Sequence, residues 1–207
     1  MKKKVFLGIL LVVVICFCVF SLLNCCVEQQ EKKIDSLEKQ ILSLKSDVSF
    51  VQFLVKDRNT RSGSESITVM FKIFNLDNKE IAKFEDTLKG TELFIDFQLV
   101  KISSAYLAFP FRYFSEQQAP ATGKLFYSYY DEKNFPKIYS SDSAFYGLSK
   151  ESLTTIFSEL KKPGENVSDF GSAVHEISSI SDFEVGIPYK IIYHPQKGGI
   201  EIVTGDF

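Results

Sequence analysis

The spacing of hydrophobic residues changes twice along the chain and divides the sequence into three parts. Residues from Val5 to Leu23 form one apolar run without a charged side chain. From Ile34 the apolar residues recur at alternating intervals of three and four, which is typical of a coiled-coil helix. Beyond about Arg58 they occupy every second position in several short segments, which is typical of β-strands with one buried face. The pattern therefore predicts an apolar N-terminal segment, a helical stalk and a β-rich globular domain.

The alternating three and four spacing predicts a parallel, two-stranded coiled coil in the stalk, residues 28–57. The positions expected in its interface are Ile34, Leu37, Ile41, Leu44, Val48, Val51 and Val55. β-Branched residues take every a position and leucine takes most d positions, a combination that favours parallel dimers. An amphipathic helix folded back on its own domain would give the same spacing, and so short a coiled coil is only marginally stable in isolation. Phe50 and Phe53 broaden the apolar face, which predicts that the last turns dock on the domain.

A polar break at residues 58–64 predicts a linker, followed by a globular domain of residues 65–207. Alternation predicts strands over 67–73, 80–88, 93–99, 106–114, 125–130, 187–193 and 200–203. Pro110 predicts an edge strand or a bulge where it interrupts the segment 106–114. Ser149 caps a predicted helix over 150–161, and 167–177 is a weaker helical segment. The expected fold class is mainly β (α+β), an antiparallel β-rich domain with one or two helices near its C-terminal half.

The apolar segment is long enough to cross a membrane. The 19 residues from Val5 to Leu23 would reach about 28 Å as a helix at ~1.5 Å per residue, close to the thickness of a bilayer core. Lys2, Lys3 and Lys4 precede it, and a cluster of lysines stays on the cytoplasmic side. Residues 1–27 therefore predict a membrane tether, with the rest of the chain exported.

Three identities of this tether remain open. Leu22-Leu23-Asn24-Cys25 resembles a relaxed lipobox of bacterial lipoproteins. The resemblance implies that Cys25 is lipidated, although Asn24 stands where the strict pattern has Gly, Ala or Ser. An uncleaved transmembrane signal anchor is the second identity, and simple secretion is the third. Simple secretion fits least well, because the apolar run exceeds that of a cleaved secretory peptide.

Composition adds an unusual aromatic balance and a weak acidic charge. The chain has 20 Phe and 9 Tyr but no Trp, which predicts a Phe-packed core, with an aromatic-lined ligand cavity as the alternative. The net charge is −2. Without the three lysines of residues 1–27, 21 basic side chains face 26 acidic ones, a net charge of −5. Nucleic acid needs a basic field, so it is not an expected partner.

Residues with catalytic or metal-binding chemistry are scarce. All four cysteines lie within residues 16–26, so the exported domain has no disulfide. Glycoside cleavage uses two carboxylates at a fixed separation. The candidate pairs for hydrolysis of an envelope polymer are Asp131 with Glu132 and Asp182 with Glu184. No catalytic, metal-binding or cofactor-binding residue is assigned, and no cofactor is expected.

These observations predict location and organisation more sharply than activity. We expect a bacterial cell-envelope protein, anchored by its N-terminus with its C-terminal domain outside the cytoplasm. Its expected partners are the membrane lipid bilayer, a second copy of the chain and another envelope protein. The layout resembles that of bacterial bitopic scaffolds of cell shape, division and pilus assembly, which implies a structural or adaptor role. A module that binds an apolar, lipid-like ligand and an envelope-polymer hydrolase are the alternative hypotheses.

Overall fold

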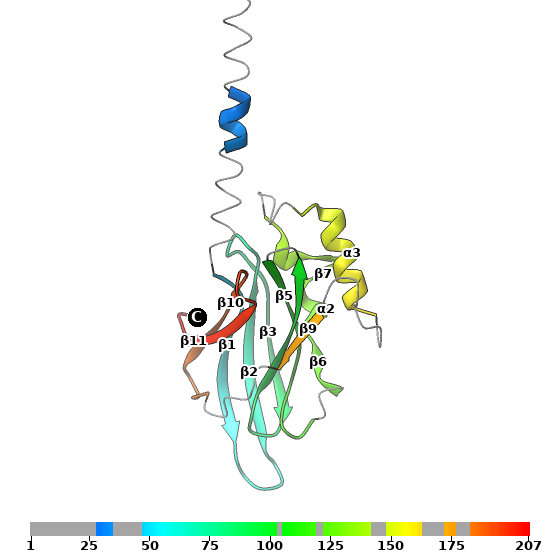
Figure 1. Ribbon diagram of the computed structural model, residues 1–207. Helices are drawn as coiled ribbons and strands as arrows, with labels where there is room; N and C mark the ends of the chain where they lie inside the picture. Colours follow the sequence, from blue (N-terminus) through cyan, green and yellow to red (C-terminus); the bar gives the residue numbers. More distant parts are fainter. Residues whose placement is uncertain are drawn as a thin grey trace, which may run out of the picture. The chain divides into compact units, whose positions relative to one another are not determined.

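The computed structural model of the 207-residue chain describes residues 28–34, 47–102, 105–118, 122–141, 148–162, 172–176 and 183–207 (Figure 1). Its internal contacts divide the chain into two units, Met1–Leu42 and Ser43–Phe207. In the first unit, residues 28–34 are helical and exposed. In the second unit, antiparallel strands form the sheets, which confirms the β-rich class expected from the sequence.

The larger sheet contains five strands in the order β11-β10-β1-β2-β3, all paired antiparallel. Their bounds are β1 Val48–Asn59, β2 Ser66–Phe74, β3 Glu80–Lys89, β10 Pro188–His194 and β11 Gly199–Thr204. The central strand β1 lies between β2 and β10, so the end of the chain returns to pair with the beginning of the domain. We call these five strands the first sheet.

The second sheet contains four strands in the order β6-β5-β4-β9. Their bounds are β4 Phe94–Ile102, β5 Ala105–Phe114, β6 Lys124–Leu125 and β9 Ser172–Glu176. The β4–β5 register shifts where Asp96 pairs with Arg112 but Phe97 pairs with Pro110. Phe111 is the extra residue of a bulge, which confirms the irregularity expected at Pro110.

Short elements follow β6 and lie beside the second sheet (Figure 1). They are α2 Tyr127–Tyr130, β7 Asp131–Glu132, β8 Phe135–Pro136 and η2 Lys137–Tyr139. The longer helix α3, Lys150–Leu160, begins at Ser149, whose side chain accepts a hydrogen bond from the Ser152 backbone N–H. The helix and cap expected from the sequence are therefore confirmed.

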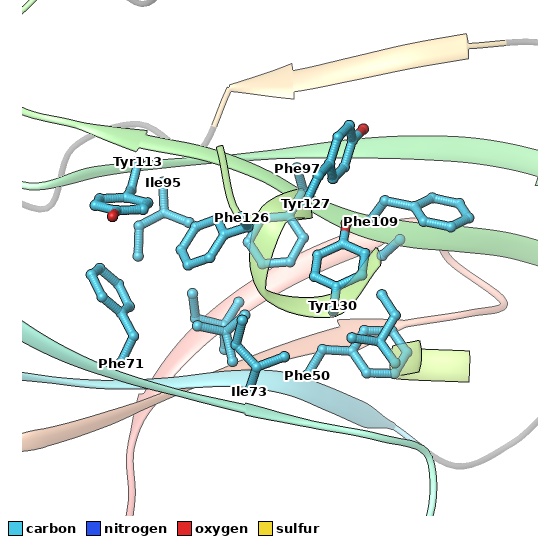
Figure 2. Packing of buried hydrophobic residues seen from close by; sticks show 14 of the residues in the cluster. Phe50, Phe71, Ile73, Ile95, Phe97, Phe109, Tyr113, Phe126, Tyr127 and Tyr130 are labelled. Carbon is cyan, nitrogen blue, oxygen red and sulfur yellow. The ribbon is translucent and has the colours of Figure 1, made fainter. Parts of the chain in front are cut away.

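Aromatic rings fill the space between the two sheets. Phe71 of β2 contacts Tyr113 of β5 with ring centroids 4.9 Å apart, and Phe126 packs against both at 5.3 and 4.9 Å. Figure 2 shows Phe71 rising from the first sheet toward Tyr113 and Ile95 of the second. Farther along, Phe157 of α3 packs on Tyr127 at 5.0 Å. These are ordinary contact distances between rings, so aromatic side chains occupy this part of the interior, as expected for a Phe-packed core.

Both predicted hairpins of the first sheet are confirmed. β2 and β3 pair across the turn at residues 75–79, and β10 and β11 pair across the turn at residues 195–198. In one strand of each hairpin alternate residues are buried in the core, namely Ile67, Val69 and Phe71 of β2 and Ile191 and Tyr193 of β10. Alternation of apolar and polar residues is sufficient to predict β2 and β10, because each of these strands has one buried and one open face.

The prediction of a coiled-coil interface is wrong at Val48, Val51 and Val55, because all three lie in strand β1. Val51 and Val55 are fully buried, as is Phe53 between them. Pairing on both sides satisfies the backbone of this segment, and burial of alternate side chains stabilises it as a strand. Of the expected linker at 58–64, residues 58–59 are the end of β1 and residues 60–64 belong to the loop that leads to β2, both strands of one sheet.

Two other segments differ from their expected structure. Of the predicted strand 125–130, only Leu125 lies in a strand, the two-residue β6, and residues 127–130 form the helical turn α2, in which Tyr127 and Tyr130 are buried. The predicted weak helix 167–177 contains strand β9 at its described residues, 172–176, which pair with β4. In both cases tertiary pairing or packing outweighed the local pattern.

Candidate functional site

Of the coiled-coil and lipidation candidates outside β1, the structure describes only one. Ile34 lies in the helical residues 28–34 and is 55% exposed. Leu37, Ile41 and Leu44 lie outside the residues that the structure describes, and so does Cys25. Within the described part of the chain, no helix combines the length and hydropathy needed to cross a bilayer.

The carboxylates considered for hydrolysis form structural contacts. Asp131 Oδ2 lies 2.6 Å from Lys161 Nζ at the end of α3, and its Oδ1 accepts from the Asn134 backbone N–H. Glu132 pairs with Lys137 at 3.7 Å. Asp131 and Glu132 are neighbours in a strand, where successive side chains point to opposite faces, so they do not face a common substrate. Asp182 lies outside the described residues, and Glu184 is exposed.

Three buried tyrosines donate hydrogen bonds across the domain. Burial raises the pKa of Tyr113, Tyr127 and Tyr130 above the ordinary tyrosine value of 10.0, at which the hydroxyl is already protonated at neutral pH. Tyr113 donates to Asp86 Oδ2 at 2.8 Å, and Asp86 also pairs with Lys124 at 2.6 Å. These contacts join β5 and β6 of the second sheet to β3 of the first, which is a structural role.

The solvent-facing side of the first sheet carries a row of lysines. Direct cross-strand partners give the row Lys83, Lys72, Gln52, Lys190 and Val203, one residue from each strand. Lys72 and Lys83 are directly opposite, an arrangement that costs free energy. Among the described residues, no ion pair within 4.0 Å involves Lys72, Lys83 or Lys190. This face, which we call the lysine face, is therefore locally basic on an acidic domain.

The outer edge of β5 is covered by hydrogen bonds from side chains and loops. Tyr139 Oη accepts from the Ala108 N–H and donates to the Ala108 C=O, both at 2.9 Å. Tyr130 donates to the Pro110 C=O at 2.7 Å, and Pro110 has no N–H to satisfy. Tyr106 N–H donates to the Pro195 C=O at 2.7 Å. The tyrosines thus replace the neighbouring strand that β5 lacks along this stretch.

The edge strand β3 is protected in a different way. Five of its ten residues are charged: Glu80, Lys83, Glu85, Asp86 and Lys89. Charged side chains on an edge strand discourage pairing with another chain. Tyr129 also stacks on Phe84 with ring centroids 3.6 Å apart. This edge is therefore unsuited to binding a further strand.

The edge strand β11 has neither protection. Its sequence Gly-Ile-Glu-Ile-Val-Thr contains one charge, at Glu201, and no proline. Within the described residues its only strand neighbour is β10. Ile200 and Ile202 pack against the core, whereas Glu201 and Thr204 are exposed. No second strand among the described residues pairs with the outer side of β11.

The backbone groups that face this open edge follow from the register. Gly205 N–H donates to Pro188 C=O at 3.0 Å, so residues 188 and 205 form a hydrogen-bonded pair. Such pairs alternate with non-hydrogen-bonded pairs along an antiparallel ladder. Glu201 and Val203 therefore direct their backbone groups to β10, while Ile200, Ile202 and Thr204 direct N–H and C=O outward. We call these three residues the open edge.

A small polar cluster lies beside the open edge. His194 Nδ1 lies 2.6 Å from Asp47 Oδ1, and His194 Nε2 lies 3.4 Å from Glu201 Oε2. These contacts join the residue before β1 to the β10–β11 hairpin. No group of three or more His, Cys, Asp or Glu side chains among the described residues is arranged to hold a metal ion.

No protein-family model, curated protein or solved structure matches this chain. Sequence reasoning missed the open edge, although one signal was present: 200–203 carries a single charge, whereas 80–89 carries five. Only the strand order reveals that both segments are edges.

Proposed function

We propose that this chain is a membrane-tethered, exported protein of the bacterial cell envelope, and that its β-rich domain acts as an adaptor by binding another protein. In this proposal Lys2, Lys3 and Lys4 stay in the cytoplasm and residues 5–23 enter the bilayer. The tether is either an acyl chain on Cys25 or an uncleaved signal anchor. The domain then acts outside the cytoplasm.

The contrast between a filled interior and an open edge is the observation that supports an adaptor role best. Rings from both sheets and α3 contact one another at 4.9 to 5.3 Å through the interior. The interior of an aromatic-lined binding cavity would instead present rings that face an empty space. The features left for recognition are therefore on the surface, namely the open edge and the lysine face.

Dimerisation through the stalk is part of the proposal in a shortened form. Because β1 begins at Val48, the heptad positions that remain for a coiled coil are Ile34, Leu37, Ile41 and Leu44. A coiled coil this short is weak by itself. Confinement of two chains to one membrane surface raises their effective concentration and favours association.

Crosslinking in intact membranes tests the adaptor role. The full-length chain and a control with residues 1–42 alone, both tagged, are expressed in native cells and treated with a lysine-reactive crosslinker before extraction. We expect the full-length chain to form discrete adducts with another envelope protein that the control does not form. If both chains give the same adducts, the domain binds no partner and the proposal fails.

A further inference from the structure

We propose that the open edge of β11 binds an extended segment of a partner protein, which pairs with it as a sixth strand of the first sheet. The inference rests on the proposed function, since it specifies how the adaptor would hold its partner. An edge strand offers a row of backbone donors and acceptors, and strand addition is a recurrent mode of peptide recognition.

Two other edges of the domain, those of β5 and β3, support this choice of site. Tyr139 and Tyr130 satisfy the outer backbone of β5, and charges protect β3. The residues after β11 also leave its edge uncovered. Gly205 continues the pairing toward Pro188, and the Phe207 ring lies 4.2 Å from Lys72 Nζ on the lysine face.

The side chains of β11 define the chemistry of the partner segment. Positions that pair with Ile200, Ile202 and Thr204 would lie on the core side, where β-branched residues fit. The position opposite Glu201 would lie on the lysine face and favours a basic residue. The position opposite Val203 extends the row that contains Lys190 and Lys72, and favours an acidic residue.

A second copy of the chain is a poorer occupant of this edge. Two β11 strands paired antiparallel would be related by a two-fold axis perpendicular to the sheet. That axis reverses every strand, so the two β1 strands would begin at opposite ends of the joined sheet. Two chains tethered through residues before β1 to one membrane surface do not fit this arrangement, so the partner is a different protein.

Two synthetic peptides of equal composition test the proposal. Thr-Glu-Val-Lys-Val-Thr, aligned antiparallel to β11, places its lysine opposite Glu201 and its glutamate opposite Val203. Thr-Lys-Val-Glu-Val-Thr exchanges the two charges. The isotope-labelled full-length chain in detergent micelles is titrated with each peptide up to millimolar concentration, and NMR follows the exchange of individual backbone amides.

We expect the first peptide to slow exchange at Ile200, Ile202 and Thr204 at least tenfold, with little change at Glu201 and Val203, which already bond to β10. The second peptide should bind at least threefold more weakly. Glu201→Lys should reverse this preference. Thr204→Pro, which removes an outward N–H, should weaken binding of the first peptide, whereas Thr204→Val should preserve it.

Three outcomes would overturn the inference. In the first, millimolar peptide does not slow amide exchange at the open edge. In the second, the peptide binds but slows amide exchange at other residues instead. In the third, amide exchange at the open edge slows without peptide as the protein concentration rises. The last would assign the edge to a second copy. In each case a partner crosslinked in native membranes would still support the adaptor role, so the two proposals fail independently.

Discussion

At the scale of single residues, hydroxyl groups hold the second sheet together where it lacks a strand. Tyr139 is 3% exposed, and its hydroxyl both accepts from and donates to the backbone of Ala108, which is fully buried. Without that hydroxyl, a buried N–H and a buried C=O would lose their partner. A buried unsatisfied group costs more free energy than the net gain from an average hydrogen bond.

Tyr139→Phe should therefore lower the free energy of unfolding by about 1–3 kcal/mol. Tyr106→Phe is the matched control, because no described residue forms a side-chain hydrogen bond with the Tyr106 hydroxyl. Urea denaturation of the two variants measures the difference. Equal stabilities would show that the Tyr139 hydroxyl does not support the β5 edge.

Glu116 fixes the loop that connects β3 of the first sheet to β4 of the second. Its Oε1 and Oε2 accept from the backbone N–H groups of Thr91 and Glu92 at 2.6 and 2.8 Å. Gly90 precedes them at φ +109°, where an added Cβ would lie 2.6 Å from Glu116 Oε2. Partial burial acts to raise the pKa of Glu116, but the backbone hydrogen bonds from Thr91 and Glu92 outweigh it and lower the pKa.

The lowered pKa predicts a pH dependence. Since the folded chain holds Glu116 ionised more strongly than the unfolded chain does, this contribution to stability is complete well above pH 4.5, the ordinary Glu value. It is lost as the pH falls through the lower folded-state pKa. Glu116→Gln should reduce stability at pH 7 and show a smaller further loss at pH 3 than the unchanged protein, as measured by urea denaturation. An identical loss in both would contradict the role given to Glu116.

At the scale of elements, the sequence predicts a strand well where the spacing of its apolar residues fits a strand and does not also fit a helix. The hairpins β2–β3 and β10–β11 follow from alternate apolar residues and polar turns, and α3 follows from its Ser149 cap and three-four spacing. β1 was mistaken for helix because Val48, Val51 and Val55 also continue the heptad ladder. Its pairing with β10, more than a hundred residues away in the chain, is not visible in local spacing.

The proposed coiled-coil stalk gives the prediction at this scale. Leu37→Asp with Leu44→Asp places charges at d positions and should convert a dimer of the full-length chain to a monomer, because buried unpaired charges oppose association. Sedimentation equilibrium in density-matched detergent measures the state. Lys39→Asp with Ser46→Asp, at outer f positions of the same register, should leave the dimer intact. Monomers in all three samples would remove the coiled coil from the account.

At the scale of the whole molecule, the apolar run of residues 5–23, the helical residues 28–34 and a β-rich domain follow one another in a single chain. The sequence predicts a β-rich domain, and the structure confirms it. The candidate site was not predicted, because the open edge is a property of strand order: Ile200, Ile202 and Thr204 face outward only because β10 is their sole strand neighbour among the described residues. The proposed location of the domain outside the cytoplasm requires residues 1–27 to act as a membrane tether.

Cell fractionation with protease treatment tests this location most directly. We expect the chain to be recovered with membranes, and its domain to be cut when protease is added to cells with a permeable outer barrier. Mass spectrometry should show an acylated Cys25 or an intact Met1 end. Recovery of the full-length, unmodified chain from the soluble cell interior, protected from that protease, would contradict the account.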